Sequence, residues 1–121
     1  MTISKYVLGL LAGLLLPFVA IAADIANGKT LAEKNGCVAC HGADFNKTID
    51  TNTPKLAGQY PDYLYAALKA YQAKGKRIVG RDNPVMSAVA GNLTLKEIQD
   101  IAAYIGHLPG SIKTVEPSGF R

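Results

Sequence analysis

The sequence predicts an all-α domain, because apolar residues recur at helical spacing and no segment alternates as a half-buried strand would. Three segments, 24–35, 61–73 and 94–106, combine this spacing with residues that start or end helices. No internal repeat divides the chain, and 121 residues are the size of one domain. We therefore expect one helical domain with loops between its helices.

Residues 1–22 have the layout of a cleavable secretory signal peptide. Lys5 is followed by a run over 6–23 without a charged residue, and residues 20–22 supply small side chains at the expected cleavage site. We expect cleavage after residue 22, which leaves 23–121 as the folded domain. An uncleaved membrane anchor is the alternative, since the uncharged run is near the lower limit for crossing a bilayer.

The first helix is expected over 24–35. Ile25, Leu31 and Ala32 are available there to face a partner element, and Gly36 is a typical residue for ending a helix. The helix therefore leads directly into the cysteine motif that follows.

Residues 37–41 read Cys-Val-Ala-Cys-His, which is the C-x-x-C-H pattern of c-type haem attachment. Cys37 and Cys40 are about one helical turn apart, so each thiol can add to one of the two vinyl groups along one haem edge. His41 then turns its imidazole onto the iron. The pattern occurs once, which predicts one covalently bound haem c.

Three other uses of the cysteines compete with haem attachment. A thioredoxin-like redox pair requires a strand before the motif, and the sequence shows none. A structural zinc site requires four ligands, and the chain offers only Cys37, Cys40, His41 and His107, two of them adjacent. A plain disulfide closes only a very small loop and leaves His41 without a role.

Residues 43–60 have no sustained period and are expected to form a loop over one haem face. Within this loop, Phe45 and Leu56 are candidates to shield the porphyrin.

Two further helices are expected on the carboxyl side of this loop. One covers 61–73, where Pro61 fits the first helical position and the apolar stripe consists of Leu64, Leu68 and Tyr71. The other begins at a capping box formed by Thr94 and Glu97, and its stripe consists of Leu95, Ile98, Ala102 and Ile105.

Met86 is the candidate for the second axial ligand of the iron. It is the only methionine after Met1 is lost, and it lies in 83–87, a turn-like segment that can bring it to the opposite haem face as a loop. Filling a gap in the core is the alternative for Met86. The rival ligand is His107, which we interpret as an exposed residue that caps the end of the last helix.

Taken together, the motif at 37–42, the Pro-Lys-Leu-Ala-Gly-Gln stretch at 54–59, Met86 and a last helix reaching Tyr104 resemble class I c-type cytochromes. The chain is most similar to short bacterial single-haem cytochromes of the periplasm, including one half of the two-haem periplasmic type. The resemblance implies a compact class I cytochrome c fold of about three to five helices, with loops wrapped around one covalently bound haem.

The resemblance also implies roles for individual residues. Cys37 and Cys40 form the thioethers, His41 and Met86 are the axial ligands, and the Pro54 carbonyl accepts a hydrogen bond from the His41 ring. It implies further that the first helix crosses the last one, with Gly28 giving close approach to a residue near Tyr104, and that Ala32 stands where family members often have an aromatic residue.

A haem with both axial positions filled has no open site for substrate, which favours electron transfer over catalysis. We therefore expect a periplasmic electron carrier between a redox donor and a redox acceptor, and not an enzyme. Two alternatives remain open: a cytochrome subunit bound tightly to a dehydrogenase or oxidase, and a haem enzyme or gas sensor with an open sixth position.

The net charge of +4 falls to +3 when Lys5 is removed with the signal peptide. Such a charge steers a protein toward acidic partners and does not require nucleic acid. A basic cluster is a candidate docking face for acidic redox partners, although a solvated helix end explains it equally well. Its members are Lys69, Lys74, Lys76, Arg77 and Arg81.

Overall fold

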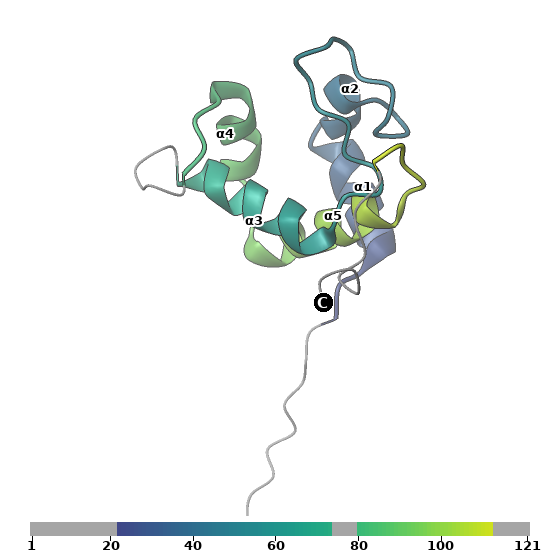
Figure 1. Ribbon diagram of the computed structural model, residues 1–121. Helices are drawn as coiled ribbons and strands as arrows, with labels where there is room; N and C mark the ends of the chain where they lie inside the picture. The colour runs from purple at the N-terminus through teal and green to yellow at the C-terminus, as the bar shows by residue number, and fades with distance from the viewer. Residues whose placement is uncertain (1–21, 74–79, 113–121) are drawn as a thin grey trace, which may run out of the picture.

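A computed structural model describes residues 22–73 and 80–112, and within these ranges the chain is helical without any strand, as predicted. The helices are α1 (Ile25–Lys34), α2 (Cys37–His41), α3 (Pro61–Gln72), α4 (Pro84–Gly91) and α5 (Leu95–His107) (Figure 1). No helix among the described residues is long and apolar enough to cross a membrane. Residues 1–21 of the expected signal peptide lie outside the described ranges.

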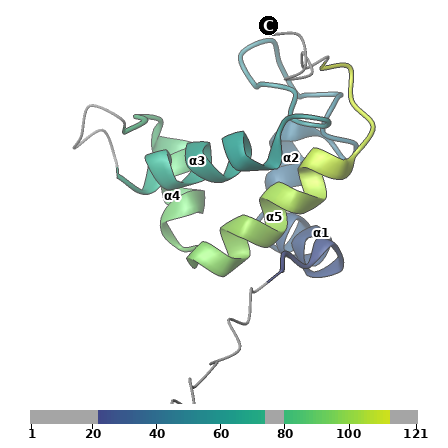
Figure 2. The ribbon, with the colours of Figure 1, turned by 60° about the horizontal axis from the view of Figure 1, so that its bottom comes forward.

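The helices are arranged around a crossing of α1 and α5, the pair in most extensive contact. α3 packs along α5 and also supports α4, while α2 contacts α1 (Figures 1 and 2). The buried apolar cluster of the described residues joins α1 and α3 to α5 and to the 42–60 loop. Its members are Leu31, Ala32, Phe45, Ala57, Leu64, Leu93, Ile98, Ile101, Ala102 and Ile105.

Local capping sets where α1 and α5 begin. The Asp24 carboxylate accepts a hydrogen bond from the Asn27 amide at 2.9 Å, which caps α1. The predicted capping box of α5 is confirmed: the Glu97 amide donates to Thr94 Oγ1 at 3.2 Å, and the Thr94 amide donates to Glu97 Oε2 at 2.8 Å. The helices over 24–35, 61–73 and 94–106 are all found within one residue of their predicted limits.

Two parts of the sequence interpretation were wrong. Ile25 and Leu95, the first residues of α1 and α5, are 41% and 54% exposed and do not belong to the buried cluster. The segment around Met86 is helix α4 and not a loop. Its Asn-Pro pair, interpreted as a turn, is an N-cap followed by proline at the first helical position.

The predicted close approach of Gly28 to the last helix near Tyr104 is confirmed at the crossing. An added Cβ at Gly28 would lie 2.0 Å from the Asp100 carbonyl oxygen and 2.9 Å from the Tyr104 Cβ. Ala32, where the family resemblance implied that an aromatic residue often stands, is fully buried. Small side chains therefore bring the two helix backbones into direct contact.

Asp100 holds the crossing together from the α5 side. Its carboxylate is 1% exposed and accepts hydrogen bonds from the Asp24 amide at 2.8 Å, from Asn27 Nδ2 at 2.9 Å and from Lys96 Nζ. Burial by itself raises the pKa of Asp100, but the hydrogen bonds and the Lys96 charge outweigh it and leave the pKa below its ordinary value. The negative charge also faces the first turn of α1, where a helix favours an anion.

Replacing Asp100 with asparagine is expected to lower the free energy of unfolding by about 1–3 kcal/mol at neutral pH, the cost of leaving buried groups imperfectly paired. The folded-state pKa of Asp100 is lowered, so its contribution is fully present above the unfolded pKa of about 3.9 and is lost as pH falls through the folded value. Urea unfolding measured against pH should therefore show the two proteins converging in acid. Asp62→Asn, at an exposed first-turn position of α3, is the control, with an expected loss below about 1 kcal/mol.

Candidate haem site

The cysteine motif forms the short helix α2, directly after α1. Gly36 adopts a φ of 73°, a left-handed conformation that lets the chain end α1 and begin α2 at once. Cys37 and Cys40 are both partly buried thiols on this helix. Burial raises the pKa of the Cys37 thiol, although a backbone hydrogen bond partly opposes the rise.

His41, the last residue of α2, is buried with 6% of its surface exposed. Its Nδ1 lies 2.8 Å from the Pro54 carbonyl oxygen, the contact that the family resemblance implied. A carbonyl oxygen only accepts hydrogen bonds, so Nδ1 carries the proton and Nε2 carries the lone pair. His41 is thereby held in the tautomer that a metal-binding imidazole requires.

Phe45 anchors the 42–60 loop beneath the His41 ring. It is fully buried, its ring stacks on His41 at 6.5 Å between centroids, and it meets the Tyr104 ring edge-on at 6.1 Å. Its backbone carbonyl accepts hydrogen bonds from the amides of Leu56 and Ala57. Phe45 was predicted to shield the porphyrin, and in the structure it connects the histidine to the crossing of α1 and α5.

Two aspartates order the loop before it reaches Pro54. Asp44 accepts hydrogen bonds from the amides of Asn46 and Lys47, both at 2.9 Å. Asp50 accepts from the amide of Thr53, the residue before Pro54, at 2.8 Å. The amide hydrogen bonds hold the pKa of the Asp44 carboxyl below its ordinary value, and hydrogen bonds from the side chain and then the amide of Thr53 do the same for the pKa of Asp50. Short-range turns thus position the carbonyl that orients His41.

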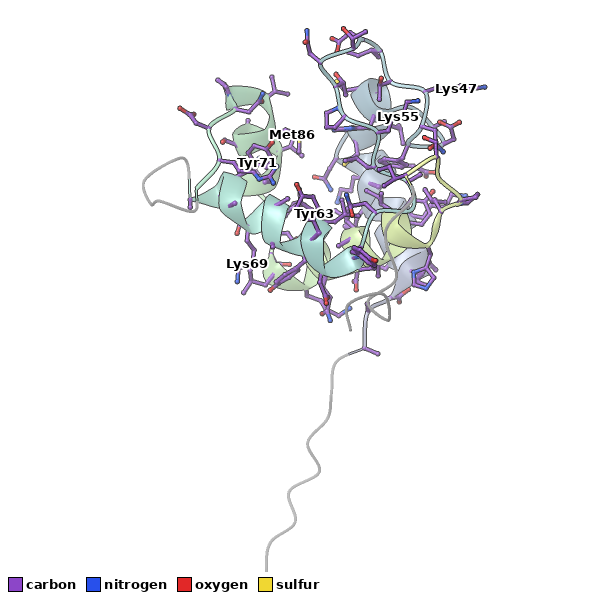
Figure 3. The ribbon with its side chains drawn as sticks, in the orientation of Figure 1. Lys47, Lys55, Tyr63, Lys69, Tyr71 and Met86 are labelled. Atoms are coloured by element: carbon purple, nitrogen blue, oxygen red, sulfur yellow. The ribbon has the colours of Figure 1, made fainter. Side chains whose placement is uncertain are left out.

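Met86 lies in the first turn of α4 and is partly buried. Asn83 caps this turn by accepting a hydrogen bond from the Met86 amide at 3.0 Å. Figure 3 shows the Met86 side chain leaving α4 on the side that faces α2 and the 42–60 loop. The thioether therefore projects toward the part of the molecule that carries His41.

His107 is exposed and ends α5, as its interpretation as a structural residue predicted. Its Nδ1 lies 2.8 Å from the Ala103 carbonyl oxygen, one turn earlier in the same helix. Among the described residues, no three His, Cys, Asp or Glu side chains gather in a group that could hold a metal ion.

Two members of the predicted basic cluster are described, and each contacts tyrosine rings. Lys69 Nζ lies 5.2 Å from the centroid of Tyr65, and the Arg81 guanidinium lies 5.5 Å and 5.6 Å from those of Tyr63 and Tyr71. In Figure 3, Lys69 projects from the other side of α3 than Tyr63 and Tyr71 do. Lys69 and Arg81 thus contact different tyrosine rings. The other members of the cluster, Lys74, Lys76 and Arg77, lie outside the described residues.

Comparison with known families decides what this arrangement is. The family model for cytochrome c matches residues 25–109, which include all five helices of the described chain. The chain belongs to the cytochrome c family. It therefore binds haem c covalently, and the Cys37, Cys40 and His41 side chains fit the attachment motif.

Known cytochromes match over most of the described chain. Cytochrome c4 of Thiocapsa roseopersicina is 36% identical over 87 residues, 71% of this chain and 42% of that protein. Cytochrome c-554(548) of Halomonas halodenitrificans is 38% identical over 84 residues, 69% of this chain and 94% of that protein. The chain thus spans about half the length of the c4 relatives it matches and nearly all of a shorter cytochrome.

Solved structures show the same fold. Reduced cytochrome c4 from Pseudomonas stutzeri superposes with a TM-score of 0.65 at 35% identity, over 80% of this chain and 52% of that one. The class I cytochrome c fold inferred from the resemblance is therefore confirmed, as is the likeness to part of a longer cytochrome.

The donors present in this chain fit a haem. Cys37 and Cys40 supply two thiols on one turn, and His41 has only its Nε2 lone pair left to offer. Met86 supplies a soft thioether on a separate helix, on the side of α4 that faces α2. All four residues were named as candidates from the sequence. Gln72 was not singled out there, and Arg81 was named only as a member of the basic cluster, whereas both residues connect α3 to the chain around α4.

Proposed function

We propose that this cytochrome is a periplasmic one-electron carrier whose haem c is ligated by His41 and Met86. The observation that carries the proposal is the hydrogen bond from His41 Nδ1 to the Pro54 carbonyl. It leaves the buried imidazole with the lone pair of Nε2 to bind a metal ion. The position of Met86 on α4, with its side chain facing α2, supports its role as the second ligand.

The haem, when bound, supplies an iron that takes up and releases one electron. The protein would orient the ligands of the iron. Phe45 and the crossing of α1 and α5 support the His41 side, and α4 supports the Met86 side. If His41 and Met86 both held the iron, no ligand position would be open to a substrate, and the expected activity is one-electron transfer between a donor and an acceptor protein. The predicted export signal supports a periplasmic location.

Replacing Met86 with alanine is expected to remove the weak near-infrared band that a sulfur ligand gives to ferric haem. The reduction potential should fall by more than about 60 mV, a tenfold change in the balance between ferrous and ferric iron, because the thioether favours the ferrous state. The reduced variant should also bind carbon monoxide, which the intact protein should not bind readily.

Val85→Ala is the matched control, because Val85 is the neighbouring residue of the same turn and is 63% exposed. It should keep the near-infrared band and the potential. Haem spectra without that band in the intact protein would contradict Met86 ligation and favour an open sixth position or His107.

A further inference from the structure

Helix α4 carries Met86 but does not fix its own position. It has eight residues, and helices this short are marginal in water without tertiary contacts. Among the helices, its main neighbour is α3. Whatever holds α4 against α3 therefore also determines where the Met86 sulfur lies.

The chain is attached to α3 before it enters α4. The Arg81 amide donates to the Ala70 carbonyl at 3.0 Å, and the Arg81 guanidinium donates to the Tyr63 hydroxyl at 2.8 Å. Both acceptors belong to α3. The amino end of α4 is thus tied to α3 through a residue three positions before Pro84.

Gln72 makes the corresponding attachment where the chain leaves α4. Its Nε2 donates to the Ala90 carbonyl at 2.8 Å and to the Leu93 carbonyl at 2.7 Å. Ala90 is fully buried and Leu93 is 6% exposed. Ala90 lies in the last turn of α4, where its carbonyl also accepts the Leu93 amide at 3.1 Å, and Leu93 lies just beyond the helix. Gln72 therefore bonds both the end of α4 and the segment that leaves it, at two residues that are shielded from water.

The orientation of the Gln72 carboxamide follows from its contacts. Both partners are carbonyl oxygens, so the NH₂ group must face them, and both of its hydrogens are used. A glutamate of the same size would have no hydrogen to donate and would bring a negative charge toward two carbonyls. Replacing Gln72 with glutamate would therefore remove both hydrogen bonds to these carbonyls and add a repulsive charge.

We infer that Gln72 is a positioning residue for the axial methionine: by capping the carboxyl end of α4 from α3, it keeps Met86 within reach of the iron. This inference rests on the proposed ligation by Met86. Gln72 touches neither the ligand nor the motif residues in the contacts described, and it acts only through the placement of α4.

The test compares the intact haem protein with Gln72→Glu, Gln72→Lys and Asn92→Asp. In Gln72→Glu, we expect carbon monoxide to bind the reduced protein about tenfold faster, because each lost buried hydrogen bond favours release of Met86. Amide hydrogen exchange in α4 should accelerate by a similar factor, and the near-infrared band should weaken. Gln72→Lys keeps a donor at this place and should restore most of the band.

Asn92→Asp is the matched control, because Asn92 donates to the Ala88 carbonyl at the same end of α4 but is exposed. The same change from amide to acid should there leave carbon monoxide binding within about twofold. If Gln72→Glu keeps the band, the carbon monoxide rate and the α4 exchange of the intact protein, the inference is overturned while Met86 ligation stands. If the intact protein itself lacks the band, the proposed ligation fails first and the inference fails with it.

Discussion

A chain in which Cys37 and Cys40 are both replaced by serine is expected to carry no covalent haem and to lose most of its helical structure. Serine hydroxyls lack the nucleophilic sulfur that forms the thioethers. The described core cannot compensate, since three of the ten members of its buried cluster are alanines. So small a domain depends on the haem for much of its apolar interior.

The measurements are haem staining after denaturing electrophoresis and far-ultraviolet circular dichroism of the purified chain. Each single serine variant should retain one thioether and stain weakly. Ala39→Ser is the control, because Ala39 is exposed on the same helix and the change adds the same hydroxyl without removing a thiol. A double variant that still held haem after denaturation would show that the attachment lies elsewhere.

Replacing Gly28 with alanine should have the second largest effect, a loss of about 3 kcal/mol or more in the free energy of unfolding of the haem protein. The new Cβ would lie 2.0 Å from the Asp100 carbonyl oxygen, far inside the contact distance of about 3.5 Å. Because that oxygen belongs to the backbone of α5, the two helices must separate. Their separation would also strain the hydrogen bonds from Asp24 and Asn27 to Asp100.

Gly91→Ala is the matched control, because an added Cβ there meets nothing within 4 Å. Alanine is also the better helix former, so this variant should be unchanged or more stable by up to about 1 kcal/mol. The measurement is the midpoint of thermal and of urea unfolding for the parent and both variants, each with haem attached. Equal midpoints for Gly28→Ala and the parent would mean that α1 and α5 adjust to the methyl group without cost.

Local signals in the sequence predicted most of the helices. The capping box at Thr94 and the proline at Pro61 fix the starts of α5 and α3, since each acts within a few residues. The same locality explains the error at Met86. Asn83 followed by Pro84 begins either a turn or a helix, and the contacts of α4 with α3 decide between them.

Tertiary partners could not be predicted in the same way. Gln72 continues the stripe of Leu64 and Leu68 at the next turn, so a polar residue on an apolar face was a signal that something there needs a hydrogen bond. Asp100, among the buried residues of α5, was a similar signal. The sequence does not say which carbonyls or amides they meet, because those lie far along the chain.

The crossing of α1 and α5 has a consequence for the order of folding. Asp24 and Asp100 are bonded across 76 positions of sequence, and every residue proposed to hold the haem lies between them. Closing so long a loop costs conformational entropy before the contact is made, so we expect such contacts to form late in folding. The hydrogen bonds of the turns at Asp44 and Asp50 join residues no more than three positions apart, so these turns can form early. We expect haem to be attached to the cysteines before α1 and α5 have packed against each other. The packing of these two helices would then complete the fold.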